Sequence, residues 1–322
     1  MVKNHLKNKI FLAGHNGMVG KSLHKLLIKK GYKNIITAKR TKLDLTNQTK
    51  VNNFFKKNKF DQVYMCAAKV GGIMANQTYP ANFIYDNIMI ATNIIHASWK
   101  TNVKKLLFIG SSCIYPKKTK QPMKEEYLLS SKLEESNEPY AISKITGIKI
   151  CESYNRQYDT DFRCVMPTNL YGIGDNFDEL NSHVIPGLIV KIHRAMITKL
   201  PFVKVWGSGK PKREFLYVDD MATICEQIMR LSKKQIKKVT KPRKIHINLG
   251  TGKGISIKNL SKIVSKVIGY KGKIIFDRNY PDGHPQKVND ISIQKKLKCK
   301  ISNNLLNGIK STYIEYLSRK VK

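Results

Sequence analysis

Three short segments in the first half of the chain carry residue types that could perform chemistry together. They are Gly14-His15-Asn16-Gly17-Met18-Val19-Gly20, then Ser111-Ser112-Cys113, then Tyr140-Ala141-Ile142-Ser143-Lys144. Closely spaced glycines suit a bound phosphate, a serine hydroxyl can bind a carbonyl oxygen, and a tyrosine near a lysine can transfer a proton. Together these groups predict hydride transfer between a nicotinamide and a sugar carbonyl.

The glycine-rich segment follows the apolar run 9–13 and opens a stretch of helical spacing over 18–30. Glycines here allow a tight turn and a close backbone approach to a pyrophosphate, and the helix N-terminus supplies N–H donors. An ordinary strand-to-helix turn is the alternative interpretation. The position at the first turn of a strand-helix series favours dinucleotide binding by residues 14–20.

Arg40 stands where the second predicted strand, residues 34–38, ends. An acidic residue at this place would bind the ribose hydroxyls of NAD, whereas a cation accommodates the 2'-phosphate of NADP. Arg40 could also be one more surface cation. We expect NADP(H) as the cofactor, with Arg40 as a contact.

The Tyr-x-x-x-Lys spacing occurs twice, at Tyr140/Lys144 and at Tyr316/Lys320, which is no more than chance predicts in a chain so rich in lysine. Position separates the two pairs. Tyr140 and Lys144 lie on the predicted helix 138–158, one turn apart and on one face. We expect the Lys144 ammonium to lower the phenol pKa, and Ser111, after the preceding strand, to bind the reacting carbonyl oxygen.

Strand and helix patterns alternate through the first half of the chain. Strands are predicted at 9–13, 34–38, 63–67, 105–109 and 162–165, and helices at 18–30, 48–57, 81–99 and 138–158. Such alternation is typical of an α/β, Rossmann-type, doubly wound parallel sheet.

The second half has a mixed pattern. Helices are predicted at 182–195, 219–231, 256–268 and 305–318, strands at 202–205, 214–217, 245–249 and 273–276, and an exposed linker at 232–244. We therefore predict an NADP-binding Rossmann domain over 1–170 and a smaller mixed α/β substrate-binding lobe over 171–322. The boundary is approximate, and segments can interleave across it.

The net charge of +37, from 59 Lys and Arg against 22 Asp and Glu, raises the possibility of nucleic-acid binding. Most of the cations are lysines, they are dispersed, and no helix-turn-helix, zinc-finger or RNP-type motif is present. We expect solvated lysine faces and no dedicated nucleic-acid site. The charge would still attract a polyanionic substrate such as a nucleotide sugar.

No apolar run approaches the roughly 20 residues that span a bilayer, and the first ten residues do not resemble a secretory leader. The six cysteines form no C-x-x-C pair, and the eight histidines have no metal-ligand spacing. We expect a cytoplasmic chain with reduced thiols, no membrane partner and no metal.

The glycine loop, Ser111 and the Tyr140/Lys144 pair together resemble the extended short-chain dehydrogenase/reductases, most of which act on nucleotide sugars. Further motifs over nearly the whole chain resemble one branch, the GDP-L-fucose synthases, which epimerise and reduce GDP-4-keto-6-deoxy-D-mannose. These motifs are Ala68-Lys69-Val70-Gly71-Gly72-Ile73, residues 110–116, Asn137-Glu138-Pro139-Tyr140, residues 166–172, Asp175-Asn176-Phe177, residues 181–186, residues 205–209, Arg213-Glu214-Phe215 and Pro281-Asp282-Gly283. The chain departs from the branch at Ile173-Gly174, where Pro-His is frequent, and in its lysine content.

The resemblance implies roles that composition does not. Cys113 would be the base and His183 the acid that invert C3 and C5 of the ketosugar, before NADPH reduces C4 to give GDP-L-fucose. Without the resemblance, Cys113 would be interpreted as a small buried cysteine and His183 as a histidine in the first turn of a helix. The other implied contacts are Lys191, Trp206, Arg213 and Asp282 at the GDP-sugar, with Pro167, Thr168, Asn169, Leu170, Ser111, Tyr140, Lys144 and His183 at the cofactor. A homodimer joined through the long helices 81–99 and 138–158 is also implied.

Three alternatives remain open at this stage. Another nucleotide-sugar epimerase or a dehydratase could share the fold, although dehydratases of the family have an Asp-Glu pair where this chain has Cys113-Ile114. A non-catalytic dinucleotide-binding regulator would commonly lack the Tyr140/Lys144 pair. Binding of nucleic acid through lysines would show strongly salt-dependent retention on DNA.

Overall fold

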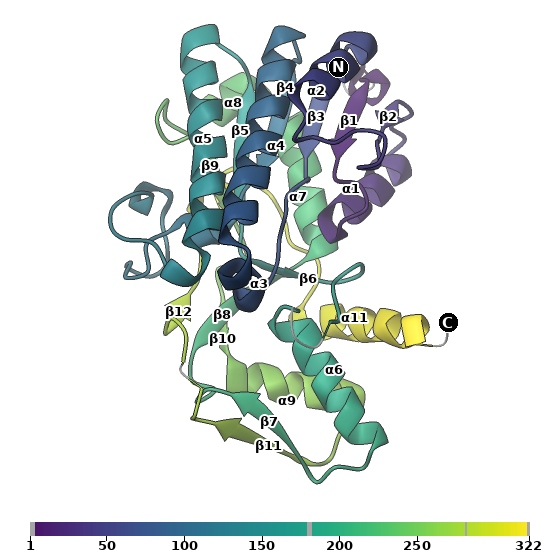
Figure 1. Cartoon of the computed structure of the whole chain (residues 1–322), viewed down its shortest axis with the longest axis vertical. Coiled ribbons are helices and arrows are strands. Elements are labelled where there is room, and N and C mark those ends of the chain that lie inside the picture. The colour runs from purple at the N-terminus through teal and green to yellow at the C-terminus, as the bar shows by residue number, and fades with distance from the viewer. Residues whose placement is uncertain (1–3, 179–181, 281, 321–322) are drawn as a thin grey trace.

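The structure of the protein, a computed structural model, describes residues 4–178, 182–280 and 282–320. A larger lobe is built around one parallel sheet, and a smaller lobe carries mixed strands and three helices (Figure 1). None of the helices described is both long enough and apolar enough to cross a membrane.

The sheet of the larger lobe has six parallel strands in the order β2-β1-β3-β4-β5-β9. Their bounds are β1 Ile10–Ala13, β2 Ile35–Ile36, β3 Gln62–Met65, β4 Lys105–Ile109, β5 Phe162–Pro167 and β9 His246–Leu249. From β1 the chain goes first to β2 on one side and later to β3 on the other. This reversal beside β1 is where open α/β sheets bind their ligands, at the carboxyl ends of the strands.

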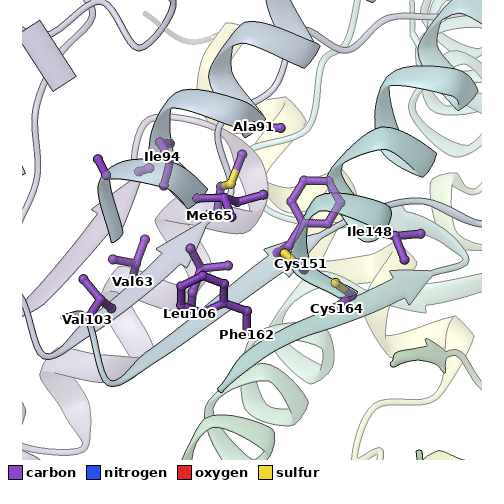
Figure 2. Close-up of a cluster of buried hydrophobic side chains, with 14 of the residues drawn as sticks. Val63, Met65, Ala91, Ile94, Val103, Leu106, Ile148, Cys151, Phe162 and Cys164 are labelled. Atoms are coloured by element: carbon purple, nitrogen blue, oxygen red, sulfur yellow. The ribbon is translucent and has the colours of Figure 1, made fainter. Parts of the chain in front are cut away.

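Helices cover both faces of this sheet. They are α1 Met18–Lys29, α2 Gln48–Asn58, α4 Pro80–Lys100, α5 Glu138–Tyr158 and α7 Val218–Arg230. Apolar residues of α2, α4 and α5 pack on one face, and those of α1 and α7 on the other. Figure 2 shows the first of these cores, where Ile94 of α4 and Ile148 of α5 meet side chains such as Leu106 of β4. Because both faces are covered, most residues of the strands are apolar.

The smaller lobe is centred on β8, Lys212–Tyr217, which pairs with three short strands. These are β6 Asn169–Tyr171, β10 Gly254–Ser256 and β12 Gln286–Lys287, while β7 Phe202–Trp206 pairs with β11 Lys273–Asp277. The helices α6 Val184–Ile197, α9 Ile257–Ile268 and α11 Leu305–Lys320 enclose a third apolar core. The described chain also has three short α-helices, α3 Ile73–Thr78, α8 Lys233–Lys237 and α10 Ser292–Lys296, and four 3-10 helices.

The predicted fold class is confirmed, and most predicted elements begin and end within three residues of those observed. The prediction that residues 232–244 form an exposed linker is wrong in part, because the segment contains a short helix. The Ser232 hydroxyl accepts from the Gln235 N–H and begins α8, and the apolar Ile236 is buried. Both α7 and β9 pack in the larger lobe, so the chain passes between the lobes more than once.

Candidate active site

The glycine loop lies between the ends of β1 and β3. Gly14 has a φ of +83°, and a Cβ there would lie 2.5 Å from the backbone nitrogen of Ala67. A Cβ on Gly20 would lie 2.1 Å from the Gly14 oxygen, so α1 packs directly against the loop. A Cβ on Gly17, the N-cap of α1, would meet no atom closer than 3.6 Å. Two glycines thus hold the turn closed while Gly17 leaves its outer side open, which fits a pyrophosphate at the helix N-terminus.

The predicted 2'-phosphate contact, Arg40, is exposed and lies four residues beyond β2. Burial lowers the pKa of His15 in the glycine loop, and His24 and Lys39 lower it further; sequence reasoning did not single out Lys39. The turn after β2 therefore brings the Lys39 ammonium near the dinucleotide loop.

The turn after β4 carries Ser111 and Cys113. Ser111 is the N-cap of a short 3-10 helix, Ser112–Ile114, and its Oγ accepts from the Cys113 N–H at 3.3 Å. Two residues on, the Tyr115 hydroxyl donates to Asn248 Oδ1 at 2.5 Å and ties the turn to β9. Both Ser111 and Cys113 are half-buried. The hydroxyl and the thiol are thus fixed side by side at the carboxyl end of the sheet.

Tyr140 and Lys144 lie near the start of α5. The Lys144 side chain is buried, and its Nζ donates to the Ile109 carbonyl at 3.0 Å and lies 5.6 Å from the Tyr140 ring centroid. The Tyr140 ring packs edge-on against Phe83 of α4, with centroids 6.3 Å apart. The lysine therefore fixes α5 to the end of β4, immediately before Ser111.

The expected effect of Lys144 on the phenol is a wrong prediction. Burial raises the pKa of Tyr140 above its ordinary value, and the nearby Cys113 raises it further. The described hydrogen bond of Lys144 goes to Ile109, and Lys144 is not among the groups that shift the pKa of Tyr140. Burial also lowers the pKa of Lys144 to about 8. The phenol is therefore protonated at neutral pH, as a proton donor must be.

Cys113 has charged neighbours that the sequence did not reveal. Burial raises the pKa of its thiol, while the Ser111 hydroxyl, Lys287 and Lys144 oppose that rise. Lys287 is half-buried on β12 and pairs in register with Arg213 of β8. The sequence does not show how a strand of only two residues pairs with β8. The proximity of Lys287 to Cys113 could therefore be found only in the folded chain.

The residues expected beside the nicotinamide follow β5. Pro167 ends the strand, Thr168 is buried, and Asn169 and Leu170 begin β6. The Thr168 N–H donates to the Leu249 carbonyl at 2.9 Å, and Asn169 Nδ2 donates to the Glu214 carbonyl at 2.8 Å. These bonds join β5 to β9 and to β8 of the smaller lobe.

His183 is the N-cap of α6. Its side chain is exposed, yet desolvation by neighbouring protein atoms lowers its pKa. In the described part of the chain, no hydrogen bond or ion pair joins it to Cys113 or Tyr140. Asn181 and Pro281, which belong to the motifs of the resemblance, lie outside the described residues.

The substrate contacts expected in the smaller lobe are near one another. Lys191 Nζ lies 4.6 Å from the Trp206 ring centroid, and Trp206 stacks on Tyr280 with centroids 4.5 Å apart. Arg213 is half-buried, and its Nη1 donates to the His284 carbonyl at 2.5 Å. Tyr280 is a further candidate that sequence reasoning missed, because its partner Trp206 is 74 residues away.

Asp282 holds a turn together. Its carboxylate accepts from the Ser208 N–H at 2.7 Å and from the Ser208 hydroxyl at 2.5 Å. A Cβ on Gly207, at a φ of +82°, would lie 2.5 Å from the same carboxylate. Both carboxylate oxygens are thus engaged by the turn at 207–209, next to Trp206.

Comparison with known proteins gives consistent results. The family model described as "NAD dependent epimerase/dehydratase family" matches residues 10–250. GDP-L-fucose synthase of Escherichia coli (strain K12) is 51% identical over 311 residues, which cover 97% of each chain.

Two solved structures are also similar. A GDP-6-OMe-4-keto-L-xylo-heptose reductase from C. jejuni has a TM-score of 0.91 and 36% identity, covering 98% of this chain and 99% of that chain. A GDP-L-fucose synthetase from Naegleria fowleri bound to NADP has a TM-score of 0.86 and 26% identity, covering 97% and 95%. The glycine loop, the Ser111-Cys113 turn and the Tyr140/Lys144 pair are thus found in a chain that belongs to the NAD-dependent epimerase/dehydratase family and, within it, to the GDP-L-fucose synthases.

Proposed function

We propose that this protein converts GDP-4-dehydro-6-deoxy-D-mannose to GDP-L-fucose, by epimerisation at C3 and C5 followed by NADPH-dependent reduction at C4. The observation that carries the proposal is that Cys113 lies with Ser111, Lys144 and Tyr140 in one group at the carboxyl end of β4. A base for α-protons and a proton donor for a carbonyl oxygen therefore face one reaction centre. The similarity to GDP-L-fucose synthases supports this substrate.

The residues present fit NADP(H). The open side of Gly17 and the N-terminus of α1 would bind the pyrophosphate, and Arg40 the 2'-phosphate. Residues 167–170 would lie beside the nicotinamide, which supplies a hydride when the cofactor is bound. The Naegleria fowleri synthetase with bound NADP supports this cofactor.

The reduction requires a proton at the C4 oxygen. Ser111 Oγ would bind the carbonyl oxygen, and Tyr140 would donate its phenolic proton to the forming alkoxide. The raised pKa of Tyr140 keeps that proton in place until charge develops on the oxygen. The buried Lys144 ammonium then stabilises the tyrosinate that remains.

The epimerisation requires removal and return of protons beside the C4 ketone. The Cys113 thiolate would remove the proton from C3 or C5, and His183 would return one on the opposite face. Lys287 and Lys144 favour the thiolate against the rise in the Cys113 pKa that burial causes.

The GDP part of the substrate would bind in the smaller lobe. Arg213 and Lys191 are cations suited to the diphosphate, and the exposed Trp206 offers an aromatic face. Asp282 would act by holding the turn beside Trp206.

We further propose a cytoplasmic homodimer that pairs α4 and α5 with the same helices of a second copy. The exposed side of α5 has an apolar groove lined by Ile142, Ile145 and Ile150 together with Leu129 and Leu133. All six cysteines are unpaired, which suits a reducing compartment.

One assay tests the proposed function directly. The protein is incubated with the ketosugar and NADPH, and the sugar product is identified by NMR. GDP-L-fucose is the expected product. A product reduced at C4 without inversion at C3 and C5 would refute the epimerase activity and leave only the reductase activity.

A further inference from the structure

A cavity of about 560 Å³ lies in the larger lobe, at the opposite end of α5 from Tyr140 and Lys144. Its walls are the C-terminal end of α5, the start of β5, and α8 with the loop that leads to β9 (Figure 1). None of the candidate active-site residues lines it. Its volume is in the range of small-molecule sites, about 300–1,000 Å³.

The inner wall of this cavity is apolar. Phe162, Ile236 and Ile245 line it, and each is otherwise buried in the fold. Pro242 adds an apolar edge on the loop after α8. An apolar wall of this kind favours a ligand with an organic body, because a bare inorganic ion gains nothing from it.

The rim of the cavity carries unbalanced positive charge. Asp159 is the partner of both Lys233, at 2.7 Å, and Lys237, at 3.3 Å. Arg156 and Lys241 also line the cavity, and neither makes an ion pair in the described part of the chain. The rim therefore has more cations than carboxylates to neutralise them.

The second carboxylate at the cavity does not change this balance. Asp161 is held in a two-bond pair with the buried Arg163, at 2.7 and 2.5 Å. Arg163 also donates to the carbonyls of Ile228 and Leu231, which fixes it to the C-terminal end of α7. That pair is internally neutral, so the excess charge lies with Arg156, Lys241 and the one charge that Asp159 leaves on Lys233 and Lys237.

Lysines are so frequent in this chain that a cationic rim alone would carry little meaning. The rim and wall of this cavity together differ from an ordinary lysine-rich surface in two ways. The cations border a recessed apolar wall, and one of them is an arginine, whose planar fork can bind phosphate with two hydrogen bonds.

We propose that this cavity is a second ligand site, which binds an organic monophosphate with its ring against Phe162, Ile236 and Ile245 and its phosphate on Arg156 and Lys241. The site is separate from the GDP-sugar site and does not depend on the proposed reaction. Its natural ligand shares this chemistry, a planar apolar body that carries one phosphate.

Phenyl phosphate is a minimal probe of this chemistry. Calorimetry on the full chain, with NADP⁺ and GDP saturating the active site, should show saturable binding of one phenyl phosphate. Inorganic phosphate should bind at least tenfold more weakly, because it lacks the ring. Equal affinity for the two, or no saturable binding at millimolar phenyl phosphate, would overturn the proposal.

Two variants locate the binding. Arg156→Gln with Lys241→Gln should weaken phenyl phosphate at least tenfold, the scale of one lost charge-assisted hydrogen bond. The matched control, Lys258→Gln with Lys262→Gln on α9, removes two exposed cations elsewhere and should not change the affinity. Thr240→Trp, which fills the cavity, should abolish binding while thermal unfolding shows a folded protein. Native affinity in the cavity variants would place the probe elsewhere and refute the site.

Discussion

Lys144 Nζ donates a hydrogen bond of 3.0 Å to the carbonyl oxygen of Ile109, the last residue of β4. This bond joins the helix that carries Tyr140 to the strand that ends just before Ser111. The phenol of Tyr140, the hydroxyl of Ser111 and the thiol of Cys113 are thereby held in one frame.

Tyr140→Phe should lower the rate of NADPH oxidation by roughly 100-fold or more, because the C4 oxygen loses its proton donor. Cofactor affinity, measured by calorimetry, should change little. Tyr316→Phe is the matched control, since Tyr316 belongs to the other Tyr-x-x-x-Lys pair, on α11 of the smaller lobe. A folded Tyr140→Phe protein that oxidises NADPH at a near-normal rate would show that Tyr140 is not the proton donor.

Arg40→Ala should weaken NADPH binding by about 1.5–3 kcal/mol, the contribution of a charge-assisted hydrogen bond, and leave NADH almost unchanged. The exposed Lys42, on the same turn, supplies the control Lys42→Ala. Calorimetry with both cofactors is the measurement. Equal losses for NADPH and NADH would reduce Arg40 to a general electrostatic role.

The kcat/KM for NADPH should fall as the pH rises above about 8. In the folded protein Lys144 has a pKa of about 8, lowered from 10.5, so its charge is lost as the pH rises through that value. This parameter reports the free enzyme, in which that pKa applies. In Lys144→Arg the guanidinium stays charged over this range, so the remaining activity should lack this decline. An unchanged decline in the variant would assign it to another group.

Lys287→Met should slow epimerisation more than reduction. Lys287 opposes the rise in the pKa of the Cys113 thiol, so its loss leaves less thiolate at neutral pH. Epimerisation is measured as deuterium uptake from D₂O at C3 and C5. Reduction is measured as NADPH oxidation in the presence of a ketosugar that is already inverted. Lys287→Arg should restore most of the uptake. Equal losses in both reactions would indicate that Lys287 only binds substrate.

The sequence predicted those parts of the site that local patterns determine. The glycine loop could be found because its glycines follow an apolar strand and begin an amphipathic helix. The Tyr140/Lys144 pair could be found because four-residue spacing places two side chains on one helix face. Ser111 could be found from its place after a buried strand, whereas the role of Cys113 came only from the resemblance to GDP-L-fucose synthases.

The remaining features depend on contacts between distant segments. Lys287 reaches Cys113 through a two-residue strand, and Tyr280 reaches Trp206 across a paired β7 and β11. The pKa of Tyr140 was predicted in the wrong direction because spacing shows that Lys144 is near but not that its ammonium donates to Ile109. Burial, which dominates that pKa, is a property of the whole fold.

The separation of epimerisation from reduction is the central claim, and Cys113→Ser tests it most directly. A hydroxyl replaces the thiol with almost no change in size but is a far weaker acid, so the accessible base is lost. The measurement is product stereochemistry by NMR, together with deuterium uptake from D₂O at C3 and C5. We predict that the variant binds NADPH and the GDP-sugar, takes up no deuterium, and slowly yields a 6-deoxyhexose without inversion. Full yield of the L-fuco product would contradict the account and exclude Cys113 as the essential base.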